Sequence, residues 1–136
     1  MFELEFARGY DYSGEDGSIV IPVVLRNGAN EVRLAASVDT GASFCVFGTE
    51  IADALGLDLV SGVRKCFRTA NSVFDAYGHE LELHVLGLAT HSLIHFFADL
   101  AIDKNVLLGR TGWLDRVRPG LIHHDSKICL APYDAV

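Results

Sequence analysis

Three consecutive residues, Asp39-Thr40-Gly41, have the chemistry to take part in hydrolysis together. A carboxylate can take a proton from water, a glycine lets another backbone approach closely, and a threonine hydroxyl can fix a loop by hydrogen bonding. Hydrolysis of a peptide bond without a metal or a covalent nucleophile needs one ionised and one protonated carboxyl group. Two carboxyl groups about 3 Å apart divide their pKa values in this way. The triplet therefore supplies one half of such a site.

A second motif, Leu107-Leu108-Gly109-Arg110, is an apolar-apolar-Gly element nearer the C-terminus. From average residue usage, roughly one chain in fifteen of this length contains Asp-[Thr/Ser]-Gly by chance, and roughly one in two hundred contains both motifs in the right window. Together with Val38-Asp39-Thr40-Gly41-Ala42-Ser43, the element resembles the retropepsin-like (retroviral-type) aspartic proteases. The resemblance extends over most of the chain.

The resemblance implies a mainly-β (all-β) fold, a closed barrel with a flap hairpin and one or two short helices. It also implies that Asp39 is the catalytic aspartate. The remaining site residues that it implies are the active-site loop Thr40, Gly41, Ala42 and Ser43, the substrate flap Thr69, Ala70, Asn71, Ser72 and Val73, and the supporting strand Leu107, Leu108 and Gly109, with Arg110 at the start of the next helix.

No second Asp-[Thr/Ser]-Gly occurs in the sequence, so the other carboxylate must come from another copy. A homodimer with both Asp39 side chains at its two-fold axis meets this need, because an isologous interface places a residue opposite itself. In the family the chain termini supply much of the interface as interleaved strands, and the candidates here are Phe2 to Phe6 and Ile128 to Leu130. The expected partners are a second copy and a peptide or protein substrate.

Two features depart from the retroviral pattern. Ser43 and Thr111 stand where retroviral members usually have an acid, or an acid or Asn, at positions that could contact Arg110. An ion pair that braces the loop is therefore expected to be missing or differently made. The flap tip, Ala70 to Val73, is poor in glycine, which implies a stiffer or differently shaped flap.

The elements that would position these residues are mostly extended. Apolar residues alternate from Ile19 to Leu25 and from Val32 to Val38, and Asn27-Gly28 between them predicts a hairpin with one buried face. Pro22 cannot donate to a ladder and predicts an edge or a bulge in the first arm. Thr49 is a plausible N-cap for a helix that ends at Gly56.

Further strands are predicted around Asn71-Ser72, where a long hairpin runs from about residue 64 to residue 85. Other extended segments are expected over residues 92–102, 106–108 and 127–130, with a short helix over 112–117 that Trp113 packs onto the core.

Composition excludes several classes of function. The 136 residues are half apolar and 21% charged, which is typical of one folded domain, residues 1–136. A formal charge of −7 with dispersed cations argues against nucleic-acid and membrane partners. The acidic start Met1 to Glu5 lacks the features of a secretion signal, so we expect a cytoplasmic protein.

No cofactor or metal is expected. His91 and His95 have metal-ligand spacing only on a helix, whereas the residues around them favour a strand. Metal binding is not expected at the His123-His124 pair either. The three cysteines, Cys45, Cys66 and Cys129, are expected to be reduced and mostly buried.

The function expected from this reading is that of a homodimeric aspartic endopeptidase. One alternative is a catalytically inactive, protease-like peptide-binding or dimerisation module. Another is a chain that is inert alone and needs a different partner chain.

Overall fold

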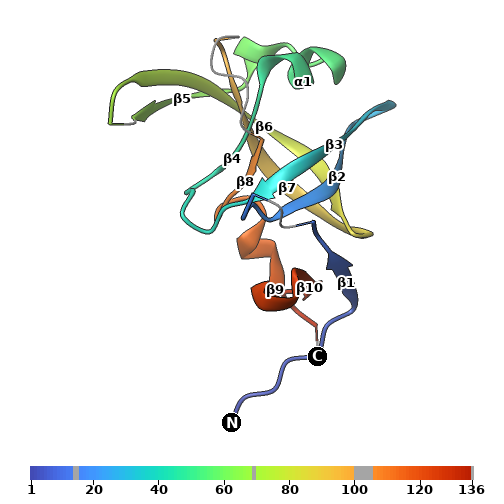
Figure 1. Cartoon of the computed structure of the whole chain (residues 1–136). Helices are drawn as coiled ribbons and strands as arrows, with labels where there is room; N and C mark the ends of the chain where they lie inside the picture. The colour runs from blue at the N-terminus through green and yellow to red at the C-terminus, as the bar shows by residue number, and fades with distance from the viewer. Residues whose placement is uncertain (14–15, 69, 100–105, 136) are drawn as a thin grey trace.

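The first predicted hairpin is present and forms one side of the larger sheet (Figure 1). The computed structural model describes residues 1–13, 16–68, 70–99 and 106–135. Strand β2 (Val20–Asn27) pairs with β3 (Asn30–Val38), and Gly28 at the turn has a φ of +59°, which glycine adopts without strain. The turn is Gly28-Ala29, one residue later than expected. The alternation is confirmed, since Ile21 and Leu25 are fully buried.

The second predicted hairpin is also present. Strand β5 (Val63–Arg68) pairs with β6 (Val73–Val85), and β6 continues through a tight turn into β7 (Leu88–Phe97). Leu86 and Gly87 at this turn both have positive φ angles. Strand β7 therefore begins before the expected Ser92, and the part of that prediction from residue 100 onward lies outside the described residues.

Seven strands are joined in the order β2-β3-β8-β4-β7-β6-β5, where β4 is Cys45–Phe47 and β8 is Leu107–Leu108. A further pairing of β2 with β6 closes six of them into a mixed barrel, and β5 extends from β6 outside the closure (Figure 1). Only Val23 to Arg26 of β2 pair with β6, so Pro22 lies where that edge of β2 has no β6 partner. The fold is the expected mainly-β barrel.

The helix α1 (Thr49–Ala54) covers one end of the barrel. Its N-cap is Gly48, so the prediction that Thr49 is the cap is wrong by one residue, while Gly56 ends the helix with a φ of +69° as expected. The largest fully buried side chains are Trp113, Phe47 and Phe96. Trp113 lies at the start of a 3₁₀-helix, Leu114–Arg116, which is shorter than the expected helix, and two other 3₁₀-helices are Leu59–Ser61 and His123–Asp125.

A smaller sheet of three strands lies below the barrel in Figure 1, with the order β1-β10-β9. Its strands are β1 (Arg8–Asp11), β9 (Val117–Ile122) and β10 (Lys127–Pro132). Strands β1 and β9 were not expected from the sequence, and residues 2–6, expected as a terminal strand, form none in the structure. Both edges of β10 are paired within the chain. The expected interleaving of Ile128 to Leu130 with a second copy is therefore wrong, because β10 has no free edge.

No helix in the part of the chain that the structure describes is both long and apolar enough to cross a membrane.

A part-buried hydrogen bond ties the N-terminal segment to the C-terminal one. Tyr12 is 4% exposed, and its hydroxyl lies 2.7 Å from Nδ1 of His123, with the two rings stacked. We expect Tyr12→Phe to lower the free energy of unfolding by about 1 kcal/mol, because a buried side chain loses its hydrogen bond. Urea unfolding measures this change. Tyr133→Phe is the control, since Tyr133 is 61% exposed, and an equal effect of both substitutions would contradict the expectation.

Candidate active site

Asp39 lies directly after β3, where the backbone leaves the barrel. Its amide donates to the carbonyl of Leu108 at 3.0 Å, and its carbonyl accepts from the amide of Ala42 at 3.2 Å. The amide of Gly41 donates to Oδ1 of Asp39 at 2.9 Å. The carboxylate is half-buried and held by the backbone of its own loop. The loop thus presents a positioned acid at a strand end.

The loop crosses directly over the second motif. A Cβ at Gly109 would lie 2.2 Å from the carbonyl oxygen of Phe44 and 2.8 Å from that of Ala42, so only glycine fits. Beyond the crossing, the amide of Arg110 donates to Ala42 and the amide of Thr111 donates to Ser43, each at 2.9 Å. The structure therefore brings the two predicted motifs together.

A side-chain hydrogen bond braces the outer part of the loop. Nη2 of Arg110 donates to Oγ of Ser43 at 3.1 Å. The expected change at Ser43 is thus confirmed, because a neutral hydroxyl makes the contact with Arg110. Arg110 lies in a turn and not at the start of a helix, since the 3₁₀-helix begins only at Leu114.

Cys45 packs beneath the crossing and is fully buried. Its Sγ accepts a hydrogen bond from the amide of Gly109 at 3.3 Å. Burial, together with the charge of Asp115, raises the pKa of the thiol to about 11. Cys45 is therefore a protonated packing group, as expected. Cys66 is exposed on β5, so the prediction that it is buried is wrong: Phe67, the next residue, takes the inward place on the strand.

The tip of the β5–β6 hairpin is exposed at Ala70, Asn71, Ser72 and Val73, and Thr69 lies outside the described residues. Between the loop and this hairpin is a groove of about 420 Å³. Its walls are mostly apolar and come from the loop side (Ala42, Ser43, Phe44, Val46 and Leu107) and from the hairpin side (Cys66, Phe67, Arg68, Phe74 and Phe97). The loop that holds Asp39 thus forms one wall of an apolar groove, and the hairpin forms the other.

Phe44 joins the loop to the β5–β6 hairpin and to β7. Its ring packs edge-on against Phe67, with centroids 5.8 Å apart, and against His95, at 5.0 Å. Nζ of Lys65 lies 4.7 Å from the centroid of Phe44. The sequence analysis did not single out Phe44, Phe67 or Lys65. Two features of the sequence could have indicated these residues. Phe44 directly follows the loop, and Lys65 and Phe67 are two residues apart on one strand, so their side chains lie on the same face.

His95 is 4% exposed within this cluster, and its Nδ1 has no hydrogen-bond partner in the described structure. Burial lowers the pKa of His95 to about 4, and the charges of Lys65 and His79 act in the same direction. The ring is therefore neutral above that pH. His91 and His95 both lie on β7, so the expected strand is confirmed at these positions.

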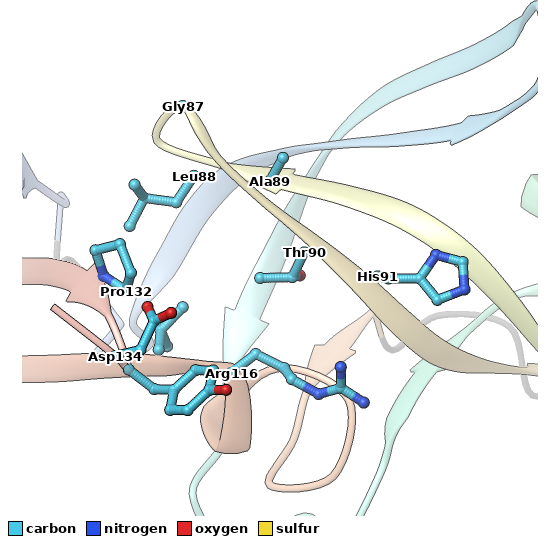
Figure 2. Close-up of a pocket in the computed structure, with 10 residues that line it drawn as sticks. Gly87, Leu88, Ala89, Thr90, His91, Arg116, Pro132 and Asp134 are labelled. Carbon is cyan, nitrogen blue, oxygen red and sulfur yellow. The ribbon is translucent and has the colours of Figure 1, made fainter.

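Another hollow, of about 340 Å³, lies away from the loop, between the start of β7 and the C-terminal segment. Figure 2 shows Leu88 and Thr90 on its β7 side, with Arg116 and Pro132 opposite. None of the predicted site residues lines it. The two motifs therefore direct attention to the other groove, which Ala42 and Ser43 of the loop line, although Asp39 itself does not.

Comparison with known proteins agrees with this geometry. A family model described as aspartyl protease matches residues 21–111. A retropepsin-like aspartic protease from Rickettsia conorii shares 25% sequence identity and has a similar structure (TM-score 0.68), covering 92% of this chain and 99% of that one. The retroviral protease-like domain of Ddi1 from Leishmania major shares the fold at 20% identity (TM-score 0.60), covering 87% and 90%. No curated protein matches the chain significantly.

The barrel and the crossed loop define an acid-protease fold that carries a single Asp-Thr-Gly triplet. The chain belongs to the retropepsin-like aspartyl protease family.

The loop crossing makes a direct prediction. Gly109→Ala should lower the free energy of unfolding by more than about 3 kcal/mol, or prevent folding, because the backbone of Phe44 would have to move. Thermal unfolding of purified protein measures the loss. Gly9→Ala is the matched control, because a Cβ there would meet only Sγ of Cys129 at 4.0 Å. A Gly109→Ala variant as stable as the native chain would contradict the prediction that no Cβ fits at the crossing.

The pKa of His95 predicts how stability changes with pH. Between about pH 6.5 and 4 the unfolded chain binds a proton that the folded ring does not bind, so stability falls as the solution becomes more acidic. The loss should approach about 3 kcal/mol by pH 4. Urea unfolding at several pH values should show this component in the native chain and not in His95→Phe. His124→Phe, at an exposed position, should retain it, and parallel pH profiles for all three chains would argue against the interpretation.

Proposed function

We propose that this chain is a homodimeric aspartic endopeptidase that hydrolyses peptide bonds with two Asp39 carboxyl groups and a water molecule. The observation that carries the proposal is the position of Asp39. It is fixed by the crossing with Leu108 and Gly109 on a loop that forms a wall of an apolar groove. Family membership supports peptide hydrolysis as the reaction.

The second copy is needed because one chain supplies one such carboxylate. Thr40 and Gly41 are exposed beside Asp39, and the Thr40 hydroxyl has no partner among the described residues. These groups are accessible to the equivalent loop of a second chain across a two-fold axis. The N-terminal segment adds apolar surface, since Phe2 is 100% exposed and Leu4 is 59% exposed.

In the proposed reaction the ionised Asp39 carboxylate takes a proton from water, and the oxygen of that water bonds to the carbonyl carbon of the substrate. The protonated Asp39 of the other copy gives its proton to the carbonyl oxygen. The tetrahedral intermediate then collapses. The bond between carbon and nitrogen breaks as one hydroxyl of the intermediate returns its proton to the Asp39 that had given one. The leaving nitrogen receives a proton from the carboxyl group that had gained one from water.

The β5–β6 hairpin is proposed to be the flap. It stands opposite the loop across the groove, and an extended peptide between the two could bond to backbone groups by β-augmentation. Phe67 lies near the tip of the hairpin, where it is opposite Phe74, and its aromatic contact with Phe44 ties this part of β5 to the loop. Movement is therefore expected mainly in the exposed residues 70–73, which lie beyond this contact.

Cleavage of a diverse peptide library between about pH 3 and 7 tests the proposal, since a pair of carboxyl groups that shares a proton titrates in this span. We expect a bell-shaped activity profile with its maximum at acidic pH, and a loss of specific activity on dilution as dimers dissociate. Asp39→Asn should reduce the rate by at least about a thousandfold. Mass spectrometry of the products measures cleavage.

Asp125→Asn is the control, because Asp125 is exposed in the 3₁₀-helix His123–Asp125 and does not line the groove. Unchanged cleavage by the Asp39→Asn variant would contradict the assignment of Asp39 as the catalytic aspartate. Light scattering over the same concentrations distinguishes a homodimer from a chain that needs a different partner.

A second candidate is a peptide-binding or dimerisation module without turnover. The specific observation in its favour is the neutral bond of Ser43 with Arg110 in place of an ion pair at the outer loop. Peptide binding by the native chain without cleavage products at any pH would favour this candidate.

A further inference from the structure

Cations gather on one strand of this acidic protein. The chain has 18 acidic and 11 basic residues, yet Arg64, Lys65 and Arg68 all lie on β5. Arg64 is neutralised by Asp75, whose two carboxylate oxygens lie 3.0 and 3.1 Å from Nη2. In the described structure, neither Lys65 nor Arg68 has a carboxylate partner. Unpaired positive charge thus lies along the hairpin wall of the groove.

Lys65 is held at a defined place. Its ammonium lies over the ring of Phe44, 4.7 Å from the centroid, and 5.9 Å from the centroid of Phe67. A cation over an aromatic face is attracted electrostatically, and this contact leaves its hydrogen-bond donors unused. The positive charge is therefore fixed beside the loop and remains able to bind an anion.

A hollow of about 510 Å³ adjoins this ammonium, and Phe44, Val63, Lys65 and His95 are among the residues that line it. His95 contributes no charge near pH 5.5, because burial lowers its pKa to about 4. The acid that lines the hollow, Glu80, is engaged by Nε2 of His91 at 3.3 Å. The hollow thus combines a fixed cation with a neutral imidazole whose Nδ1 is unpartnered.

This hollow and the apolar groove are neighbours. Both are lined by Phe44, and they take consecutive parts of β5, residues 63–65 for the hollow and 66–68 for the groove. In an extended peptide, side chains on one side recur at every second residue, about 7 Å apart. A peptide that places a large apolar side chain in the groove would therefore place another side chain of the same face near Lys65.

We propose that the site selects peptides in which a carboxylate side chain, Asp or Glu, lies two residues from the large apolar side chain that fills the groove, and that Lys65 binds this carboxylate. Lys65 is thus a specificity-determining residue. The proposal rests on the proposed function for the place of the substrate. Charge complementarity supports it, because Lys65 and Arg68 on β5 have no carboxylate partner in the described structure and a peptide carboxylate would supply one.

The test uses fluorogenic decapeptides with two adjacent central phenylalanines. Glu, Gln or Lys is placed two residues before the first phenylalanine or two residues after the second. At pH 5.5, kcat/KM should be about fivefold higher for Glu than for Gln in one of the two placements, and lowest for Lys. The Glu-to-Gln ratio should approach one near pH 3, where the peptide carboxylate is protonated.

Two variants assign the preference to Lys65. Lys65→Met keeps a long side chain on Phe44 without the charge and should bring the Glu-to-Gln ratio to about one, and Lys65→Glu should favour the Lys peptide. Lys127→Met is the matched control, because Lys127 lies on β10, where it pairs with Asp11 at 3.6 Å. It should keep the native ratio. The same ratio in the Lys65 and Lys127 variants would overturn the assignment to Lys65.

Binding of the same peptides to Asp39→Asn, measured by fluorescence anisotropy, separates this inference from the proposed function. If the native chain cleaves the peptides but neither cleavage nor binding depends on the charge of the peptide, the role of Lys65 is contradicted and the endopeptidase function is supported. A second outcome is that Asp39→Asn binds the Glu peptide more tightly than the others, that the Asp39→Asn/Lys65→Met double variant does not, and that the native chain cleaves none of them. This outcome supports the role of Lys65 and contradicts the endopeptidase function. Equal binding of all three peptides, or no binding of any, overturns the inference.

Discussion

The crossing of two backbone segments at Gly109 is the constraint on which the rest of the site depends. Because no side chain separates Gly109 from the carbonyl of Phe44, the loop can lie on the strand that carries Leu108. That closeness allows the backbone hydrogen bonds that position Asp39. It also brings the side chain of Arg110 within hydrogen-bonding distance of Ser43. The site is therefore built mainly from backbone contacts, and side chains adjust it.

A second coupling runs from this crossing to the hairpin. Phe44 follows the loop directly, and it packs against Phe67 and His95 and beneath Lys65. The wall of the groove and the loop that holds Asp39 are thus parts of one packed unit. The cost is a buried imidazole with an unpartnered nitrogen, which makes this unit sensitive to acid. An enzyme that works in acid with this arrangement would be less stable at its working pH than at neutral pH.

Sequence reasoning was effective where a local pattern decides the structure. Alternating apolar residues gave the two main hairpins, and the two motifs identified the loop and the strand beneath it. It failed for β9, because Arg118-Pro119-Gly120 has no alternation and pairing with β10 alone makes it a strand. It also failed for the contacts of Phe44 and Lys65, since these depend on the distance between the loop after β3 and the β5–β6 hairpin, which no local pattern gives.

The pairing of β10 determines the order in which folding and association of the chain occur. Its neighbours β1 and β9 both come from the same chain, so the small sheet is complete in a single molecule. Folding is then a first-order event that needs no encounter, and any association between chains is a later, second-order one. If the proposed homodimer is the active form, a newly made chain is folded but inactive while its concentration is low. The concentration of dimer then rises with the square of the chain concentration, so the rate of synthesis controls activity.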